Sequence, residues 1–291
     1  MIIKGLSAIT SIVYKLRFFS HNIFIRGFVM VINAKKTVKK SNKPSGYIVY
    51  QNKVIVVIMI IRSSNKKTGN MVQTYIIRKD VNPLEALKNG KDSAICGDCI
   101  HRGRFIKNEK TGKIEWKRTC YVNVGQGVLQ VYKSYIKGNY PKYNPHKHDV
   151  RLLDKNGNKR MIRLGTYGDP AFVPLRVWEY FLPKFDGKTG YTHQWNKPWI
   201  DPNFKNIVMA SCDSKTNVND SNAIGYRSFI VVPHDEKIAK INDMNAINCL
   251  SDSIGRKCED CGLCNGNEKN KGKNVYINAH GASKRFVLSL V

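Results

Sequence analysis

The sequence predicts an α/β fold in which strands and helices alternate along the chain. Several apolar, β-branched runs are continuous rather than alternating, which is typical of strands buried on both faces of a parallel sheet. From about residue 118 onward, most of these runs are followed by a polar loop and then by a segment with a helical pattern. The right-handed crossover rule curls such units in one direction. We therefore expect a (β/α) barrel-like fold, incomplete or distorted, with a doubly wound open sheet as the alternative.

The individual elements follow from the apolar runs and from the residues that flank them. Strands are expected at residues 47–50, 54–61, 71–78, 119–124, 160–164, 189–193, 206–210, 228–232 and 275–278. Asn82 and Pro83 start a short helix that Gly90 ends, because Asn caps helices, Pro fits their first turn and Gly follows their last turn. Further helices are expected at residues 128–137, 172–181 and 236–241.

The 291 residues divide into three stretches. Residues 1–29 are apolar and basic, but charged residues interrupt every long apolar run, so no membrane span is predicted. This stretch could be a basic amphipathic segment, a poor signal peptide or an over-extended start. We favour the last, with Met30 as the initiator, and exclude the stretch from the fold. Residues 30–117 form a β-rich part and residues 118–291 the (β/α) repeats, in one continuous domain from about residue 45.

The chain carries a net charge of +28, which favours a polyanionic partner, most simply nucleic acid and in particular DNA. The lysines are scattered, and abundant Lys, Asn and Ile also fit an AT-rich genome, so part of the charge has that second explanation. Eight cysteines, several in C-x-x-C spacing, are typical of metal ligands in a reducing compartment such as the cytoplasm. Nothing in the sequence indicates an oligomeric state.

A cysteine cluster near the C-terminus predicts a metal site. Cys258, Cys261 and Cys264 follow one another at three-residue spacing, which suits one zinc ion or one iron–sulfur cluster. The fourth ligand could be Cys249 or His280. We favour zinc, because the bacterial ferredoxin-type motif continues with a fourth cysteine followed by proline, which does not follow here.

A second group of cysteines lies earlier in the chain. Cys96 and Cys99 form a C-x-x-C motif, and Cys120 follows 20 residues after it. This spacing predicts a second possible metal site, which His101 or a distant cysteine would complete. The alternative is that Cys120 is simply buried in an apolar strand.

Polar side chains follow several of the predicted strands, at the point where each strand ends. They are Asp169, His193, Asp213, His234 and His280. The carboxyl ends of barrel strands share one face, where ligands bind and chemistry occurs, so we expect these residues to converge there. The alternative for the two aspartates is that they only cap helices or form turns.

Several of these motifs resemble those of a group of uncharacterised tailed-phage proteins. The matching stretches are residues 96–102, 168–170, 190–195, 210–214 and 258–264. Together they span most of residues 45–286. The resemblance implies a phage-encoded protein in the cytoplasm of the host cell.

The barrel, the late cysteine cluster and the basic surface are more distantly similar to the tRNA-guanine transglycosylases and their phage relatives, which insert 7-deazaguanines into DNA. That family binds zinc through three closely spaced cysteines and a later histidine, which implies ligands at Cys258, Cys261, Cys264 and His280. Two residues separate Cys258 from Cys261 where the family has one, and the family's Asp-Ser-Gly-Gly-Phe-Gln signature is absent.

The resemblance implies a nucleic-acid-modifying transferase that exchanges a base of DNA for a 7-deazaguanine. Base exchange needs one carboxylate as nucleophile and another as general acid and base, and Asp169 and Asp213 are the candidates. The substrate would be bound by aromatic, basic and imidazole side chains, for which the candidates are Arg163, Tyr167, His193, Trp195, Tyr226 and Arg227. Trp195 could equally pack in the core.

Two other functions are compatible with the same motifs. One is an iron–sulfur enzyme of the radical type on a partial barrel, with the cluster at Cys96, Cys99 and Cys120. The other is a non-catalytic, zinc-containing protein that binds nucleic acid through its basic and aromatic side chains.

Overall fold

A computed structural model of the chain describes residues 44–63, 65–108, 111–149, 153, 156–234, 243–267 and 272–280. These residues belong to the unit Asn42–Val291. The interpretations made for residues 1–29 and for a helix at 236–241 lie outside the described residues.

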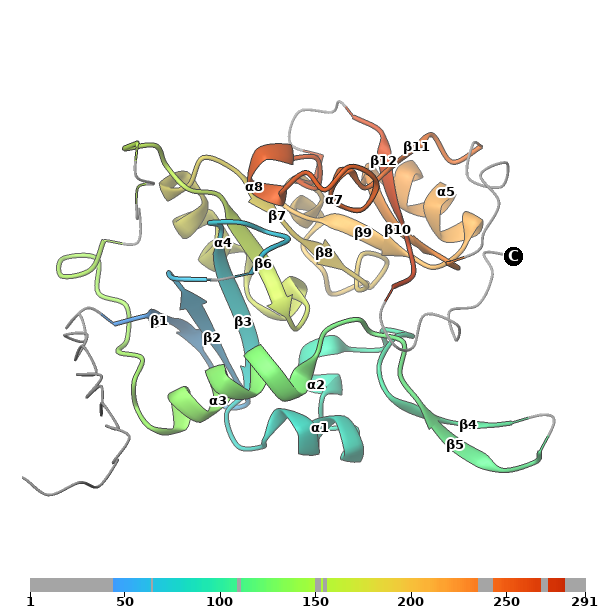
Figure 1. Cartoon of the computed structure of the whole chain (residues 1–291), viewed down its shortest axis with the longest axis horizontal. Helices are drawn as coiled ribbons and strands as arrows, with labels where there is room; N and C mark the ends of the chain where they lie inside the picture. Colours follow the sequence, from blue (N-terminus) through green and yellow to red (C-terminus); the bar gives the residue numbers. More distant parts are fainter. Residues whose placement is uncertain are drawn as a thin grey trace, which may run out of the picture. The chain divides into compact units, whose positions relative to one another are not determined.

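The first sheet has five strands in the order β1-β2-β3-β6-β7 (Figure 1). Their bounds are β1 (Gly46–Gln51), β2 (Ile55–Ile60), β3 (Val72–Arg78), β6 (Ile162–Tyr167) and β7 (Lys188–Thr189). The pairs β1–β2 and β2–β3 are antiparallel, and the pairs β3–β6 and β6–β7 are parallel. Every residue of β2 is buried, which explains its unbroken apolar sequence.

The second sheet also has five strands, in the order β11-β12-β10-β9-β8. Their bounds are β8 (Tyr191–Thr192), β9 (Met209–Cys212), β10 (Ser228–Val232), β11 (Ala246–Asn248) and β12 (Asn274–Asn278). All neighbouring strands are parallel. Their carboxyl ends therefore lie at one edge of the sheet, as the sequence pattern predicts.

Gly190 joins the two sheets, because it separates β7 of the first from β8 of the second. A side chain here would place its Cβ 2.8 Å from Val208 Cγ1 and 3.1 Å from Leu164 Cβ, so only glycine allows this close packing. The strand expected at 189–193 is thus divided between two sheets. The α/β class is confirmed, whereas the described strands form two joined sheets whose outer strands, β1 and β11, do not pair with each other.

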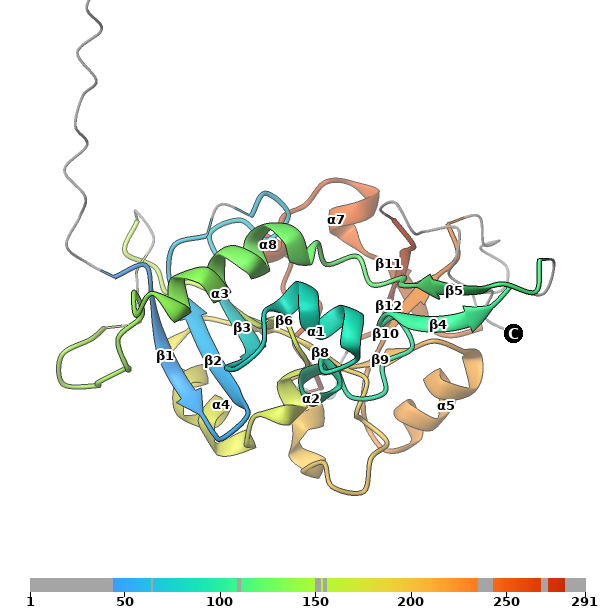
Figure 2. The ribbon, with the colours of Figure 1, turned by 90° about the horizontal axis from the view of Figure 1, so that it is seen from below.

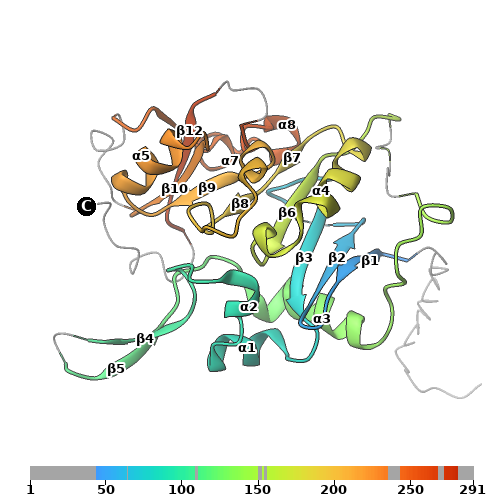
Figure 3. The ribbon, with the colours of Figure 1, turned by 180° about the vertical axis from the view of Figure 1, so that it is seen from behind.

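Helices cover both faces of the first sheet. Their bounds across the whole fold are α1 (Pro83–Asn89), α2 (Ser93–Cys96), α3 (Leu129–Ile136), α4 (Leu175–Phe181), α5 (Lys215–Ala223), α7 (Leu250–Ser253) and α8 (Cys258–Cys261). Shorter helical turns are η1 (Val124–Val128), η2 (Pro170–Phe172), η3 (Leu182–Lys184) and η4 (Pro202–Asn206). Figures 2 and 3 show α3 and α4 on opposite faces of the first sheet, and α5 on the face of the second sheet opposite α7 and α8.

The helix predicted to start at Asn82 is confirmed, with its caps. The Asn82 side chain accepts a hydrogen bond from the Leu84 amide, Pro83 is the first residue of α1, and Gly90 ends it in the left-handed conformation at φ 75°. Within the described residues, no helix is both long enough and apolar enough to cross a membrane.

The strand predicted at residues 119–124 is absent: residues 119–123 run as an irregular segment, and Val124 begins η1. The Arg118 guanidinium donates to the backbone oxygens of Cys120 and Val122, both at 2.9 Å, and folds the segment over itself. The strand pairing occurs earlier, in the hairpin of β4 (Arg104–Lys107) and β5 (Ile114–Lys117), which projects away from the sheets in Figures 2 and 3. This irregular segment contributes lining residues to the two cavities of the functional site described below.

The strand predicted at 206–210 begins three residues later, at Met209. The preceding residues form η4, which Asp201 caps by accepting a hydrogen bond from the Asn203 amide. Pro202 fits the first turn of such a helix, so local capping chemistry outweighs the apolar pattern here.

Candidate metal centre

Two adjoining cavities lie at the carboxyl ends of the parallel strands. The larger has a volume of about 300 Å³ and the smaller about 150 Å³. Both are lined by Thr119, Tyr121, Val122, Tyr191, Phe229 and Val231. Thr119, Tyr121 and Val122 therefore form part of a wall that the two cavities share.

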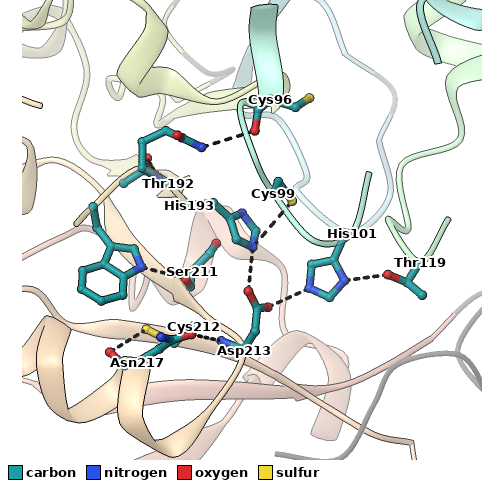
Figure 4. A network of polar contacts seen from close by, with 12 residues as sticks. Cys96, Cys99, His101, Thr119, Thr192, His193, Ser211, Cys212, Asp213 and Asn217 are labelled. Atoms are coloured by element: carbon teal, nitrogen blue, oxygen red, sulfur yellow. Dashed lines mark hydrogen bonds and ion pairs between the residues drawn. The ribbon is translucent and has the colours of Figure 1, made fainter. Parts of the chain in front are cut away.

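Three predicted or possible site residues converge beside the smaller cavity. The Nε2 atom of His101 lies 2.9 Å from Asp213 Oδ1, and the Nε2 atom of His193 lies 3.4 Å from Asp213 Oδ2 (Figure 4). One potential ligand atom from each of these residues lies within 4.8 Å of the others. Their side chains are between 11% and 20% exposed, so the group is shielded but reachable.

Cys99 adds a sulfur atom to this group. Its Sγ lies 3.7 Å from His193 Nε2, the same ring nitrogen that faces Asp213 (Figure 4). A Cys–His–Asp catalytic triad would place the sulfur and the carboxylate against opposite ring nitrogens. Because both face Nε2 here, the arrangement is that of donors directed at one point, which is how ligands surround a metal ion.

Supporting contacts hold the ring of His101 and the backbone of His193. The Nδ1 atom of His101 lies 2.8 Å from the Thr119 hydroxyl, so Nε2 is the nitrogen left to face Asp213. A partner of this kind fixes the ring orientation and the tautomer of a metal-binding histidine. The backbone amide of His193 donates to Asp169 Oδ2 at 2.8 Å.

A structured loop carries Cys99 and His101. The Arg102 guanidinium donates to the Gly97 oxygen and to Asp92 Oδ1, both at 2.7 Å, and so holds the loop against the end of α1. The C-x-x-C-x-H stretch is thereby fixed before any ligand binds.

The electrostatics of the group favour a cation. Burial alone would raise the pKa of Asp213, but hydrogen bonds from His101 and His193 hold that pKa well below its usual range. Burial alone would lower the pKa of His193, but the Cys99 sulfur and the Asp213 carboxylate raise it well above its usual value. The site therefore stabilises positive charge between these residues, which a proton or a metal ion can supply.

The predicted trio of Cys96, Cys99 and Cys120 lines the smaller cavity together. Burial and the neighbouring Cys99 thiol raise the pKa of Cys96 well above its ordinary value, and burial also raises that of Cys120. Cys120 is half-buried and lies in an irregular segment, not in an apolar strand. Cys99 is the member of the trio that faces the histidine and aspartate group.

Asp169 has a structural role. Its Oδ1 accepts from the Ala171 amide at 3.0 Å, capping η2, and its Oδ2 accepts from the His193 amide. Burial nevertheless raises its pKa. Both oxygens of Asp169 thus accept backbone hydrogen bonds, and those of Asp213 face two imidazoles, so both predicted catalytic carboxylates have partners within the protein.

The predicted substrate-binding residues divide into two groups. Arg163 lines the larger cavity and Tyr167 the smaller one. Trp195 is buried, and its indole donates to the backbone oxygen of Ser211 at 3.1 Å. The geometry therefore supports packing of Trp195 in the core over a role in substrate binding. Tyr226 and Arg227 precede β10 and lie at the amino end of that strand, so the structure does not bring them to the cavities.

The predicted C-terminal ligands line the larger cavity: Cys249, Cys258, Cys261, Cys264 and His280. Among the described residues they do not form a group with three donor atoms within 4.8 Å. Burial raises the pKa of the Cys264 thiol to about 12, so this thiol is neutral until a metal binds. Of the other strand-end residues, His234 is exposed and lines neither cavity.

The sequence predicts His101 only as a possible ligand that completes the early cysteine site, whereas the structure places it beside His193 and Asp213. The signal available was its position two residues after Cys99, within one short loop. The sequence predicts no site role for Thr119 and Tyr121, because both belong to the strand expected at residues 119–124.

Comparisons with protein-family models, curated proteins and solved structures return no match for the chain. The class of protein is therefore inferred from the residues of the site.

Proposed function

We propose that this protein is a metal-dependent enzyme whose strand-end centre binds one divalent transition metal ion, zinc in the first instance. The observation that carries this proposal is the convergence of His101 Nε2, His193 Nε2 and the Asp213 carboxylate within 4.8 Å, with Cys99 Sγ beside them. Nitrogen, oxygen and sulfur donors together suit zinc, which takes histidine, carboxylate and thiolate ligands.

Such a centre supplies Lewis-acid chemistry, and a zinc ion held by three protein ligands can activate a bound water. His101, His193 and Asp213 would hold the ion, and Thr119 and the Arg102-supported loop would orient the imidazole of His101. The smaller cavity would hold the reacting part of the substrate, with Tyr167 against it. The Tyr167 hydroxyl is buried without a hydrogen-bond partner among the described residues, so it is available to a ligand.

The substrate class that the surface supports is nucleic acid. Besides the net charge of +28, the β4–β5 hairpin exposes Phe105, Ile114 and Trp116, at 69%, 73% and 41%. Lys107, Lys113 and Lys117 lie on the same hairpin. Exposed aromatic rings among basic side chains are the elements with which proteins stack bases and bind phosphates. We propose that the hairpin is an arm that binds nucleic acid beside the centre.

The arm can be tested by its contribution to binding. Trp116→Ala is expected to weaken binding of single-stranded DNA by about 1–3 kcal/mol, the cost of one lost base stack. Trp199→Ala is the matched control, because Trp199 is also exposed but lies outside the hairpin. Equal affinities of the two variants in fluorescence anisotropy would show that the hairpin is not the arm.

Base exchange by a transglycosylase mechanism stays a prediction. The contacts favour metal-assisted chemistry over it, because two imidazoles converge on the Asp213 carboxylate, whereas Asp169 accepts from two backbone amides. The parallel series from β3 to β12 supports an open form of a (β/α) barrel, since strands that follow one another in sequence are mostly neighbours. Eight free cysteines support a reducing compartment such as the cytoplasm.

The metal proposal is tested by elemental analysis of the purified full chain. The wild type is expected to bind zinc, and His193→Ala to lose one equivalent per chain while keeping its circular dichroism spectrum. His146→Ala, which removes an exposed histidine elsewhere, should keep the full metal content. The proposal is wrong if His193→Ala retains the metal content of the wild type.

A further inference from the structure

The larger cavity gathers four cysteines from two short helices and the loops beside them. Cys249 directly precedes α7, Cys258 and Cys261 are the first and last residues of α8, and Cys264 follows Gly262, which ends α8 in the left-handed conformation at φ 65°. The Cys258 amide donates to the Lys67 oxygen at 3.1 Å, which anchors α8 to the first sheet's β2–β3 connection. All four cysteines line the larger cavity.

The sulfur atoms of these cysteines are not gathered as closely as the ligands of one zinc ion. Four thiolates around zinc at about 2.3 Å lie about 3.8 Å from each other in a tetrahedron. Among the described residues, no three of these cysteines bring their sulfur atoms within 4.8 Å of one another. An iron–sulfur cluster binds each cysteine at a different iron atom, so its ligands surround a wider space. A cavity of about 300 Å³ lies between them.

A buried cation borders the same cavity. Arg163 is 8% exposed, and its guanidinium donates to the Tyr121 hydroxyl at 2.8 Å and lies 5.5 Å from the centre of the Tyr191 ring. No carboxylate of the described part of the chain forms an ion pair with it, although a buried charge requires compensation. Arg163 lines the larger cavity together with Cys258 and Cys264.

We propose that Cys249, Cys258, Cys261 and Cys264 ligate an iron–sulfur cluster in the larger cavity, with Arg163 as its counter-charge. Four thiolates give such a cluster a net negative charge, which matches the unpaired guanidinium. Tyr191 lines the same cavity as Cys264. His280 is left out of the proposed ligand set, because it is exposed and its ring lies against Tyr121 with a centroid distance of 5.3 Å.

The experiment measures iron and acid-labile sulfide in the full chain, purified without oxygen and reconstituted with iron and sulfide. The wild type is expected to contain both in similar amounts and to give a paramagnetic signal after reduction with dithionite. Cys258→Ala and Cys261→Ala are expected to lose at least nine-tenths of the sulfide, whereas His280→Ala keeps it.

Cys96→Ala is the matched control, because Cys96 belongs to the other cavity, and it is expected to keep the sulfide. A folded wild type that binds metal but no sulfide would overturn the proposal, and this measurement does not depend on whether the cysteine variants fold. Sulfide that is lost in Cys96→Ala but kept in Cys258→Ala would also overturn it. His193→Ala removes zinc but not sulfide, so the strand-end centre can fail independently.

Discussion

The strand-end centre and the C-terminal cysteines differ in how separation along the sequence relates to distance in space. Cys258, Cys261 and Cys264 are three residues apart, yet their sulfur atoms do not come within 4.8 Å as a group. His101 and Asp213 are 112 residues apart, yet their side chains are in contact at 2.9 Å. His193 and Asp213 follow two paired parallel strands, β8 and β9, and the loop after α2 brings His101 to them. A short helix and a turn, in contrast, spread neighbouring side chains around a space.

The two regions also differ in the charge around them. The strand-end group contains an ionised carboxylate between two imidazoles, which attracts a cation. The C-terminal cysteines share their cavity with the buried Arg163, whose charge favours an anionic group there. The two proposed occupants therefore differ in the charge that surrounds them, although the two cavities share one wall.

The largest expected effect is a crossed loss of metal. Asp213→Ala should lose zinc and keep acid-labile sulfide, because it removes the carboxylate that both imidazoles face. Cys264→Ala should lose sulfide and keep zinc. Elemental analysis of both variants checks this, and a variant that empties both sites while remaining folded would show that the two regions form one centre.

Thr119→Val should weaken zinc binding without abolishing it. Val keeps the size of Thr but removes the hydroxyl that orients His101, and loss of such a partner typically costs about 10–100-fold in metal affinity. The measurement is a zinc competition titration with a chromophoric chelator. Thr216→Val, on the exposed face of α5, serves as the control and should bind zinc like the wild type.

Gly190→Ala should disturb both regions together. The added Cβ would lie 2.8 Å from Val208 Cγ1, and overpacking of this kind costs about 1–3 kcal/mol. The Gly190 amide also donates to the Cys264 oxygen at 3.3 Å, so the cysteine loop should shift with the sheet junction. Urea unfolding measures the lost stability, and an unchanged midpoint would mean that the two sheets adapt independently.

Arg163→Met should affect only the C-terminal region, and by a small amount. Reduction adds a negative charge to the cluster, which the guanidinium stabilises, so its removal should shift the reduction potential to a more negative value. A redox titration followed by paramagnetic resonance measures the shift. Zinc affinity should not change, and a potential equal to or above that of the wild type would contradict the role of Arg163.

Much of the scaffold follows from local sequence. The run from Ile55 to Ile60 is apolar throughout because the strand is buried on both faces. Asn82, Pro83 and Gly90 define α1, because capping and the left-handed turn depend on the residue itself. The placement of His193 and Asp213 after strands also follows from the sequence, since a polar residue at the end of an apolar run marks the strand's carboxyl end.

Only the tertiary structure decided which of these polar residues share a site. Asp169 looks like a catalytic residue in the sequence, but the amides of Ala171 and His193 occupy its oxygens. Residues 119–123 look like a strand, but the Arg118 guanidinium folds them into the wall between the cavities. Periodicity and capping are properties of neighbouring residues, whereas a ligand group depends on atoms that only the packing of distant segments brings together.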